Sequence, residues 1–378
     1  MKIIMFGHKR VPSREGGVEI VVEELSRRMA ELGHDVCCVN RRGHHVSGAE
    51  FDGANLKEYK RIKLRSVPTI EKKGLAAVSS SFFAALFSAL SRADVVHIHA
   101  EGPALMCPLP KLFGKRVIVT VHGLDWQREK WKHGFGAKYI RWGEKMAVRF
   151  ADEIIVLSKA VQDYFMANYG RETRFIPNGV TRPEPKQAKL ITESYGLEKG
   201  GYILFLGRLV PEKGVHYLVE AFKSIAIDKK LVIAGGSSDT EDYAVQLRQQ
   251  AEDDDRIVFT GFVQGQMLEE LYSNAYVYVL PSDLEGMPLS LMEAMSYGCC
   301  CLVSDIPECA DVVEDHGELF EKANVEDLTR KLRGLCDEPK AAAAYAEGAA
   351  DFICGKYSWD AVTLQTLNTY KRTETGVI

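Results

Sequence analysis

The stretch Val277–Val303, VYVLPSDLEGMPLSLMEAMSYGCCCLV, carries the pattern that decides the fold. Its first apolar run, Val277–Leu280, predicts a short buried strand that Pro281 ends. After the loop SDLEGMP comes LSLMEAMSY, which has helical spacing, and Gly298 predicts the end of that helix. Cys299–Val303 then returns as a second apolar run. Because helical and strand patterns alternate in this way throughout the chain, the sequence predicts an α/β fold with mainly parallel sheets.

Two acidic side chains stand at the junction, Glu285 in the loop and Glu293 in the helix, with seven residues between them. A strand-to-helix loop opens at the carboxyl edge of a parallel sheet, where α/β proteins bind ligands. The helix N-terminus adds N–H groups and the positive end of a dipole. Two interpretations compete: the acids hold a ligand, or Ser290 and Glu293 form a capping box and Glu293 only starts the helix.

Length and composition narrow the class of protein. A chain of 378 residues, 46% of them hydrophobic, predicts two or three domains. Nine cysteines without a C-x-x-C pair are typical of core thiols in a reducing cytoplasm and argue against zinc. The N-terminal MKIIMFG predicts a strand and not a signal peptide. The longest apolar stretch, Leu75–Leu90, contains four serines and is too short and polar to span a bilayer.

Positive charge is concentrated in the first half of the chain. Residues 1–180 carry 29 Lys and Arg against 19 Asp and Glu, a net charge of +10, whereas residues 181–378 carry 19 against 33, a net charge of −14. This asymmetry predicts an anionic partner for the first half, and the competing interpretation is a simple surface dipole.

An aromatic and basic segment, Asp125–Phe150, lies within that half. It holds Trp126, Trp131 and Trp142, with seven Lys and Arg against three acidic residues. This mixture suits an anionic membrane surface or a lipid-phosphate acceptor, or else an amphipathic helix whose aromatic side chains pack on the sheet. The apolar stretch Leu75–Leu90 is a second candidate for the same surface. No nucleic-acid-binding motif accompanies the segment, so nucleic acid is not an expected partner.

Candidate ligand contacts in the first half follow strand patterns. Gly16–Gly17 precedes a helix, where it either approaches a diphosphate or acceptor closely or only permits a tight turn. His97 and His99 share one face of the strand Asp94–His99, and without a nearby third ligand they more simply shape a site or satisfy core hydrogen bonds. His122 follows the strand Arg116–Val121, which suits a ligand contact; the alternative is a solvent-exposed loop histidine.

The second half opens with a strand, Tyr202–Leu206, and a cationic loop. Gly207, Arg208 and Lys213 precede a helix and form an anion cradle, because arginine offers a planar fork and lysine a point charge to phosphate oxygens. Such cations stabilise negative charge on a leaving diphosphate. Gly235 follows the next strand and permits close backbone approach to a nucleotide. The acidic run Glu252–Arg256 precedes a strand and predicts a solvated surface, which favours a metal-independent site.

Taken together, these motifs resemble those of the retaining glycosyltransferases of family 4, in the same order: Gly16–Gly17, His122, Pro177–Val180, Arg208, Lys213, Glu285 and Glu293. The resemblance implies a GT-B fold, in which two doubly wound Rossmann-like domains face each other across a cleft. Residues 1–180 would form the acceptor-side domain, with a C-terminal helix at 358–378 packing back on it. Residues 181–357 would form the nucleotide-sugar domain, and residues 181–200 read as the linker.

The resemblance also implies the activity. A hexosyl group would move with retention from a nucleotide diphosphate sugar, UDP-sugar favoured, to a lipid-linked or saccharide acceptor in cell-surface polysaccharide or glycolipid synthesis. The enzyme would need no metal and would work in the cytoplasm, with peripheral contact at the inner face of the cell membrane as a further hypothesis. Arg208 and Lys213 would stabilise the diphosphate, Glu285 would hold the sugar hydroxyls and Glu293 the ribose, and His122 would contact the sugar from the opposite wall.

The donor loop departs from the family pattern. Where the family commonly has Phe-Gly after the first acid and its glycine, this chain has Met287-Pro288, and Pro288 has no N–H. Backbone contacts to the donor would therefore come from Met287, Leu289 or Ser290, and by the same resemblance the backbone near Val263 would meet the nucleobase.

Three other classes of protein stay open: a glycoside hydrolase using both acids, a non-catalytic nucleotide-sugar sensor, and an NAD-linked oxidoreductase that would lack the glycine fingerprint.

Overall fold

The computed structural model describes residues 1–14, 16–43, 56–72, 74–128, 135–237 and 241–371. The chain divides into two compact units. Unit 1 comprises Met1–Gly179 and Trp359–Ile378, and unit 2 comprises Val180–Ser358. Among the helices that the structure describes, none has both the length and the hydrophobicity needed to cross a membrane.

In the described part of unit 1, eight strands form one sheet in the order β3-β4-β2-β1-β5-β6-β7-β8. Neighbouring strands run parallel except for the short β3–β4 pair. The strands are β1 (Lys2–Phe6), β2 (Asp35–Arg41), β3 (Glu58–Tyr59), β4 (Ile62–Val67), β5 (Val95–His99), β6 (Arg116–Val121), β7 (Glu153–Val156) and β8 (Arg174–Phe175). Every residue of β5 is buried, as expected for a central parallel strand that is covered on both faces.

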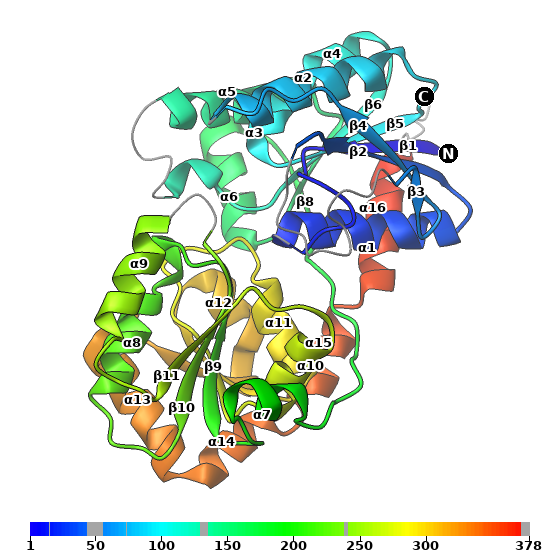
Figure 1. Cartoon of the computed structure of the whole chain (residues 1–378). Coiled ribbons are helices and arrows are strands. Elements are labelled where there is room, and N and C mark those ends of the chain that lie inside the picture. Colours follow the sequence, from blue (N-terminus) through cyan, green and yellow to red (C-terminus); the bar gives the residue numbers. More distant parts are fainter. Residues whose placement is uncertain (15, 44–55, 73, 129–134, 238–240, 372–378) are drawn as a thin grey trace. The chain divides into compact units, whose positions relative to one another are not determined.

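Helices cover both faces of this sheet. Figure 1 shows α2, α4 and α5 on one face and α1 and α16 on the other. The helical segments of unit 1 are α1 (Gly17–Glu31), α2 (Leu75–Leu90), α3 (Glu101–Ala104), α4 (Pro108–Leu112), the 3₁₀ segment η1 (Asp125–Gln127), α5 (Phe135–Phe150), α6 (Lys159–Tyr169) and α16 (Trp359–Tyr370).

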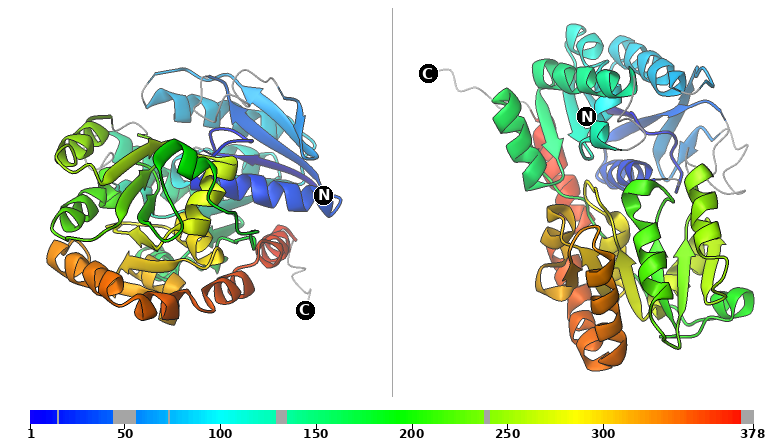
Figure 2. Two further views of the ribbon diagram at one scale, coloured as in Figure 1. Left: turned by 60° about the horizontal axis from the view of Figure 1, so that its bottom comes forward. Right: turned by 90° about the vertical axis from the view of Figure 1, so that its left-hand side faces the viewer.

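The last helix returns to unit 1 from the far end of the chain. Helix α16 packs beside α1 (Figures 1 and 2). Its Tyr370 hydroxyl lies 2.6 Å from Nδ1 of His97 on β5, and Arg116 on β6 donates to the carbonyl oxygen of Thr369. At the other end of α16, Trp359 lies against the backbone of Gly179, where a Cβ atom would come within 2.5 Å of the indole ring.

In the described part of unit 2, six parallel strands form a second sheet in the order β11-β10-β9-β12-β13-β14. The strands are β9 (Tyr202–Leu206), β10 (Lys230–Ala234), β11 (Ile257–Gly261), β12 (Val277–Leu280), β13 (Cys300–Ser304) and β14 (Glu318–Phe320). The predicted doubly wound α/β organisation is confirmed in both units, because each carries a largely parallel sheet between helical layers.

The helical segments of unit 2 also lie on both sides of its sheet, with α8, α9 and α13 on one side and α7, α10 and α11 on the other (Figure 1). They are α7 (Leu190–Tyr195), η3 (Pro211–Lys213), α8 (Val215–Lys223), α9 (Glu241–Gln250), α10 (Gly265–Asn274), α11 (Leu289–Ser296), α12 (Pro307–Val313), η4 (Glu314–His316), α13 (Val325–Asp337), α14 (Pro339–Ala346) and α15 (Ala349–Lys356).

The interpretation of residues 181–200 as a linker is wrong for their second half. Helix α7 forms inside this segment and buries Ile191 completely, with Leu197 buried just beyond it. The carboxylate of Glu270 on α10 accepts hydrogen bonds from the backbone N–H groups of Lys189, at 2.8 Å, and Ile191, at 3.2 Å. Two apolar side chains and one distant acid therefore make this polar segment an integral part of unit 2.

Candidate functional site

An ion pair joins two of the sequence-predicted residues of unit 2. Nζ of Lys213 lies 2.5 Å from Oε1 of Glu285, and the two side chains are only 14% and 8% exposed. The same carboxylate oxygen accepts a 2.6 Å hydrogen bond from the hydroxyl of Ser282. Lys213 ends the 3₁₀ segment after β9, and Glu285 lies in the loop after the neighbouring strand β12. Adjacent parallel strands thus deliver the cation and the acid to the same edge of the sheet.

The second acid, Glu293, is hydrogen-bonded by a different side chain. Oε2 of Glu293 on α11 accepts a 3.0 Å hydrogen bond from the hydroxyl of Tyr272 on α10. Tyr272 is buried, and burial together with the nearby Glu293 carboxylate raises its pKa well above the ordinary value. The tyrosine therefore stays protonated and serves as a hydrogen-bond donor to the carboxylate. Glu285 and Glu293 are held by separate sets of side chains.

The glycines of this site are required by backbone packing. A Cβ atom on Gly235, which has a φ of +147°, would lie 1.8 Å from the carbonyl oxygen of Gly207. A Cβ atom on Gly214, with a φ of +63°, would lie 1.9 Å from the carbonyl oxygen of Pro281. Contact between neighbouring strand ends explains both positions without a ligand. The expected approach of Gly235 to a nucleotide stays a prediction.

The capping-box interpretation of Ser290 and Glu293 is wrong, because α11 begins before Ser290. The N-cap is Pro288, no side chain caps the helix, and Ser290 lies inside it. The Ser290 hydroxyl instead accepts a 2.8 Å hydrogen bond from the buried Tyr278. Because Leu289 and Ser290 are the first two residues of the helix, their N–H groups have no carbonyl partner one turn earlier. Met287 is 9% exposed and precedes this helix start.

Two further predicted residues lie at the same sheet edge. Arg208 lies two residues after the end of β9 and is partly buried. Val263 follows β11, at the end of the sheet, and is also partly buried. The structure thus places Gly207, Arg208, Lys213, Gly235, Val263, Glu285 and the start of α11 after the carboxyl ends of β9, β10, β11 and β12 of one sheet.

In unit 1 the loop between β1 and α1 is fastened by side chains. Gly16 is the N-cap of α1 and has extended backbone, and Gly17 is the first helical residue. The Glu19 carboxylate accepts a 2.8 Å hydrogen bond from the N–H of Lys9, and a Cβ atom on Gly16 would come within 2.8 Å of the same carboxylate. The glycine at this position therefore makes room for the acid that holds the loop.

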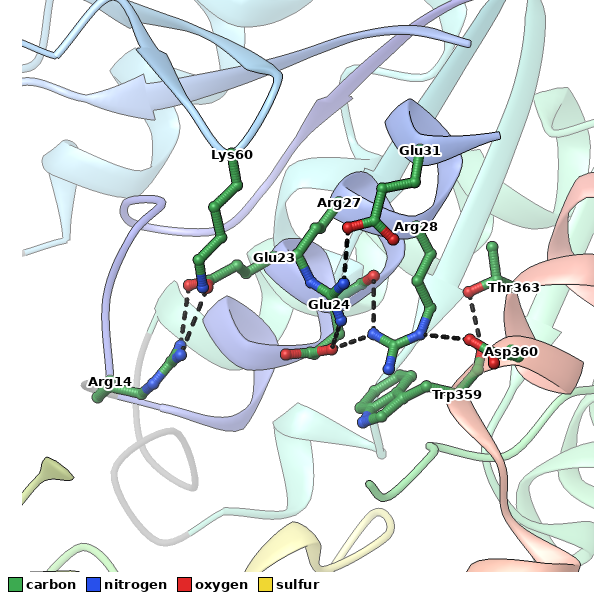
Figure 3. A network of polar contacts seen from close by, with 10 residues as sticks. All are labelled: Arg14, Glu23, Glu24, Arg27, Arg28, Glu31, Lys60, Trp359, Asp360 and Thr363. Carbon is green, nitrogen blue, oxygen red and sulfur yellow. Dashed lines mark hydrogen bonds and ion pairs between the residues drawn. The ribbon is translucent and has the colours of Figure 1, made fainter. Parts of the chain in front are cut away.

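A fully buried carboxylate on α1 holds the same loop from further along the helix. Glu23 accepts from Arg14 of the loop at 2.9 Å and from Lys60, beside β3, at 3.1 Å (Figure 3). One turn on, Arg28 pairs with Glu24 and, at 2.8 Å, with Asp360 of α16, while its guanidinium lies 5.9 Å from the centre of the Trp359 ring. This network joins the loop, α1 and the last helix.

His122 lies directly after β6, as the sequence predicted, and its Nε2 is 3.0 Å from Nδ1 of His99. The rings of His97 and His99 lie with their centres 4.2 Å apart and their planes tilted by 32°, which confirms that the two histidines share one face of β5. His97 contacts Tyr370 on one nitrogen and the hydroxyl of Thr120 on the other, at 2.7 Å. The two histidines of β5 therefore have core hydrogen bonds, and one of them supports His122.

The basic and aromatic segment is described only in part. Lys130, Trp131 and Lys132 lie outside the described residues. In the described part, the guanidinium of Arg141 lies 4.2 Å from the centre of the Trp126 ring, and Trp142 is 49% exposed. Membrane or lipid-phosphate contact by this segment stays a prediction.

Two family models match most of the chain. The model described as Glycosyltransferase Family 4 matches residues 15–182, and the model described as Glycosyl transferases group 1 matches residues 188–352. The chain belongs to the group 1 glycosyltransferases. The resemblance seen in the sequence motifs is thereby confirmed.

Curated relatives of this glycosyltransferase agree with that assignment. The alpha-maltose-1-phosphate synthase of Mycolicibacterium smegmatis is 25% identical and covers 98% of this chain and 99% of its own. The O-antigen chain mannosyltransferase B of Escherichia coli is 29% identical over half of each chain.

Solved structures confirm the GT-B fold of the glycosyltransferase. Sucrose-phosphate synthase from Thermosynechococcus elongatus superimposes with a TM-score of 0.83 at 21% identity, covering 98% of both chains. The Anabaena protein HepE, solved in complex with UDP and glucose, gives a TM-score of 0.80 at 17% identity, covering 98% of this chain and 99% of that one.

Three supporting residues of the site escaped the sequence analysis. Ser282 was recognisable in principle, because it follows the end of β12 and precedes Glu285 by three positions. Tyr272 and Tyr278 read as ordinary core aromatics on α10 and β12, and no local pattern marks their hydroxyl groups as donors to α11.

Proposed function

We propose that this glycosyltransferase moves a hexosyl group from a nucleotide diphosphate sugar, with UDP-sugar favoured, to a lipid-linked or saccharide acceptor with retention of configuration. The observation that carries the proposal is the Lys213–Glu285 ion pair at the carboxyl edge of the unit 2 sheet, the same edge at which Arg208 follows β9. A diphosphate needs cations and a sugar needs hydrogen-bond acceptors, and this edge brings both together. The complexes of HepE with UDP and with UDP-glucose favour the nucleotide choice.

Each side chain has a role that its surroundings support. Arg208 and Lys213 stabilise the negative charge of the leaving diphosphate. Glu285, oriented by Ser282, accepts from hydroxyl groups of the sugar, and Glu293, oriented by Tyr272, accepts from those of the ribose. The N–H groups at the start of α11 face the same edge and add donors for anionic oxygens. His122 contacts the sugar through its ring.

The proposed chemistry needs neither a metal nor a covalent enzyme intermediate. The diphosphate charge is met by Arg208 and Lys213, and Glu285 is already engaged by a lysine and a serine, so it is assigned to binding and not to nucleophilic attack. The acceptor hydroxyl attacks from the face that the diphosphate leaves. The bond from the anomeric carbon to the diphosphate oxygen breaks as the bond to the acceptor oxygen forms, and the acceptor proton passes to the departing phosphate oxygen.

A donor panel tests the proposal. UDP-, GDP-, ADP- and dTDP-sugars are scored for nucleotide release with and without membrane lipid extract. Arg208→Ala and Lys213→Ala should each lower turnover at least about a hundredfold, the scale of losing one electrostatic stabiliser. Lys223→Ala is the matched control, because Lys223 is the last residue of α8, at the other end of the helix from Lys213, and pairs with Asp253. Near-normal turnover in the Arg208 variant would remove its diphosphate role, and hydrolysis of nitrophenyl glycosides without nucleotide dependence would favour a glycoside hydrolase.

A peripheral membrane site for unit 1 is a separate part of the proposal. Helix α2 turns small side chains inward, including Ser80, Ser88 and Ala84, while Leu75, Phe82 and Leu90 on its outer side are 47%, 46% and 66% exposed. Phe83 and Phe87 of the same helix pack against the core, but three large apolar residues left exposed on one helix are typical of an interaction surface. The positive net charge of the first half and the exposed Arg92 beside α2 favour an anionic bilayer as the partner.

Vesicle flotation tests the membrane site. The full chain should float with vesicles containing anionic lipid, and Phe82→Glu with Leu90→Glu should abolish flotation. Val245→Glu on α9 is the control, since Val245 is 53% exposed in unit 2. Charge reversal at Lys130, Lys132 and Arg141 examines the basic segment in the same assay. Equal flotation of all variants, or none for the natural chain, would refute membrane contact.

A further inference from the structure

The buried histidines of β5 and β6 have an arrangement that restricts where their protons lie. Nδ1 of His99 and Nε2 of His122 are 3.0 Å apart. A single proton must lie between them, since two N–H groups or two bare nitrogens would not form a hydrogen bond. His99 either donates from Nδ1 or accepts there, and the choice determines the tautomer of His122.

The surroundings of the other ring nitrogen of His99 show whether Nδ1 donates or accepts the hydrogen bond. Nε2 of His99 is buried and has no hydrogen-bond partner. If His99 accepted at Nδ1, its neutral ring would carry a proton on Nε2, and that N–H group would be orphaned in the core. Buried N–H groups without a partner are rarer in proteins than buried acceptors without one. The arrangement with Nδ1–H on His99 leaves only a bare nitrogen at the unpartnered position.

His8, at the end of β1, shows that the same core tolerates a bare ring nitrogen. Its Nε2 lies 3.0 Å from Oδ1 of Asn40, and that oxygen also accepts from the N–H of Val11, while Nδ2 of Asn40 donates to the Val11 carbonyl. Because the oxygen is an acceptor, His8 must carry its proton on Nε2. Its buried Nδ1 is then bare and without a partner.

We propose that His99 is a positioning residue that fixes His122 in the Nδ1–H tautomer, so that His122 meets its ligand as a hydrogen-bond donor. Nε2 of His122 accepts from His99, which leaves Nδ1 as the nitrogen that carries the proton. Within the part of the chain that the structure describes, no hydrogen bond to this Nδ1 is found. The His122 side chain is 9% exposed, whereas His97 and His99 are completely buried.

The charge state of the rings is consistent with this arrangement. Burial lowers the pKa of His122 to about 4, with the Asp125 carboxylate opposing the effect and the Arg128 guanidinium adding to it. Burial lowers the pKa of His97 to about 3 and that of His99 well below its usual value. All three rings are neutral at pH 7, which the tautomer argument requires.

The inference rests on the proposed function only for the identity of the ligand. For a sugar donor, an Nδ1–H donor suits a hydroxyl or ring oxygen of the hexosyl group. It also prevents His122 from accepting a proton on that nitrogen, so His122 orients the sugar and does not act as the general base. His97 lies beside His99, with ring centres 4.2 Å apart and the ring planes tilted by 32°.

Nitrogen-15 NMR of the full chain, labelled at histidine, tests the tautomer directly. Protonated and bare ring nitrogens have well-separated shifts, and His122→Gln identifies the His122 signals among the 10 histidines. We expect His122 to be protonated on Nδ1 and bare on Nε2. A proton on Nε2, or shifts averaged between the two forms, would overturn the inference.

Three variants connect the tautomer to activity. His99→Phe should average the His122 tautomers and lower kcat about ten- to a hundredfold, with the donor KM unchanged, the range seen when an imidazole ligand loses its orienting partner at metal sites. His99→Asn keeps an N–H at the Nδ1 position and should restore the His122 shifts and most of kcat. Tyr370→Phe, which removes one oxygen from His97, should change neither.

Unchanged His122 shifts and unchanged kcat in His99→Phe would refute the positioning role. If the natural chain transfers no sugar from any nucleotide donor, the proposed function fails. The NMR measurement still tests the tautomer in that case, because it needs no substrate.

Discussion

At the scale of single residues, the two acids of the site are each oriented by neighbouring side chains, one of which, Lys213, is itself assigned to the diphosphate in the proposed reaction. Ser282 and Lys213 share one oxygen of Glu285, and the hydroxyl of Tyr272 fixes Glu293. Glu285 and Glu293 themselves stand out in the sequence, because they follow a strand and open a helix. The hydroxyl of Tyr272 does not stand out in the sequence, since the pattern around a buried tyrosine is the same whether or not its hydroxyl group donates a hydrogen bond to another side chain.

Tyr272→Phe tests this support. Without the hydroxyl, Glu293 loses a donor and a fixed orientation, and we expect UDP to bind about fivefold more weakly, the equivalent of one hydrogen bond of about 1 kcal/mol. Calorimetric titration with UDP measures the effect, and kcat at saturating donor should stay near normal. Tyr276→Phe is the control, because its hydroxyl donates to the carbonyl oxygen of Leu335 at 2.7 Å and not to the site. Equal UDP affinity in both variants would contradict the assignment.

Two buried acidic residues, Glu101 and Glu144, lie in unit 1. Glu101 and Glu144 are completely buried, and one oxygen of each lacks a partner in the described part of the chain. The other Glu144 oxygen accepts from the hydroxyls of Tyr164, at 2.9 Å, and Tyr169. Burial and the nearby Asp125 and Glu144 carboxylates raise the pKa of Glu101 well above its usual value. We therefore expect Glu101 to keep its proton over part of the pH range in which a free glutamate is ionised.

Glu101→Gln should become increasingly favourable as the pH rises. Above the unfolded pKa near 4.5, the unfolded chain releases the Glu101 proton while the folded chain keeps it. The natural protein therefore loses up to about 1.4 kcal/mol of stability per pH unit until the raised folded pKa is reached. Glutamine does not titrate, so the Glu101→Gln variant does not lose stability in this way as the pH rises. Denaturant unfolding at pH 5 and pH 8 measures it by tryptophan fluorescence, which reports on unit 1 alone, because Trp126, Trp131, Trp142 and Trp359 all belong to it. A pH-independent difference would show that Glu101 is ionised in the fold.

At the scale of elements, the sequence predicts short apolar strands more accurately than it predicts helix caps and polar helices. The strands Tyr202–Leu206 and Val277–Leu280 were predicted to the residue, because both are short apolar runs, the first between two glycines and the second ended by Pro281. The helix after Pro288 was also predicted from its first residue, but the alternative capping box of Ser290 and Glu293 was wrong, because the Ser290 hydroxyl lies inside the helix and accepts a hydrogen bond from Tyr278 of a neighbouring strand. Helix α7 was missed, because its few apolar residues are too sparse for a helical pattern.

The docking of α16 can be disrupted through one glycine. Gly179→Ala would place a Cβ atom 2.5 Å from the Trp359 ring, so the ring or the backbone must move. We expect a loss of about 1–3 kcal/mol in the stability of unit 1, the usual cost of overpacking, together with a changed Trp359 emission. Gly334→Ala on α13 is the control, because its Cβ atom would have open space. If the unfolding transition followed by tryptophan fluorescence is the same in Gly179→Ala as in the natural protein, α16 does not pack tightly against Gly179.

At the scale of the whole molecule, the residues assigned to the proposed reaction are divided between the two units. The cations and the two acids belong to unit 2, whereas His122 and the fastened β1–α1 loop belong to unit 1. Residues 1–180 are also the basic half of the sequence.

Hydrogen exchange should separate the contributions of the units to binding. UDP alone should slow exchange in the segments 207–214 and 285–293 of unit 2, because the diphosphate and ribose contacts are proposed there. A non-transferable UDP-sugar analogue should add protection at 122–125 of unit 1, since His122 is assigned to the sugar. Saturation with the ligand at about one hundred times its Kd stabilises the bound unit by about 2.7 kcal/mol. Protection of 122–125 by UDP alone would place His122 at the nucleotide instead.

The sequence by itself determined the α/β class, the alternation of strands and helices, and the acids and cations that follow strand ends. These features are local, because strand and helix periodicity and the chemistry of the residue after a strand are legible in a few neighbouring positions. The tertiary structure decided which side chains meet. The Lys213–Glu285 pair spans 72 positions and the Tyr370–His97 contact spans 273. Such contacts depend on strand order and on where a distant helix returns, and a hydrogen bond between remote residues leaves no periodic trace in the chain.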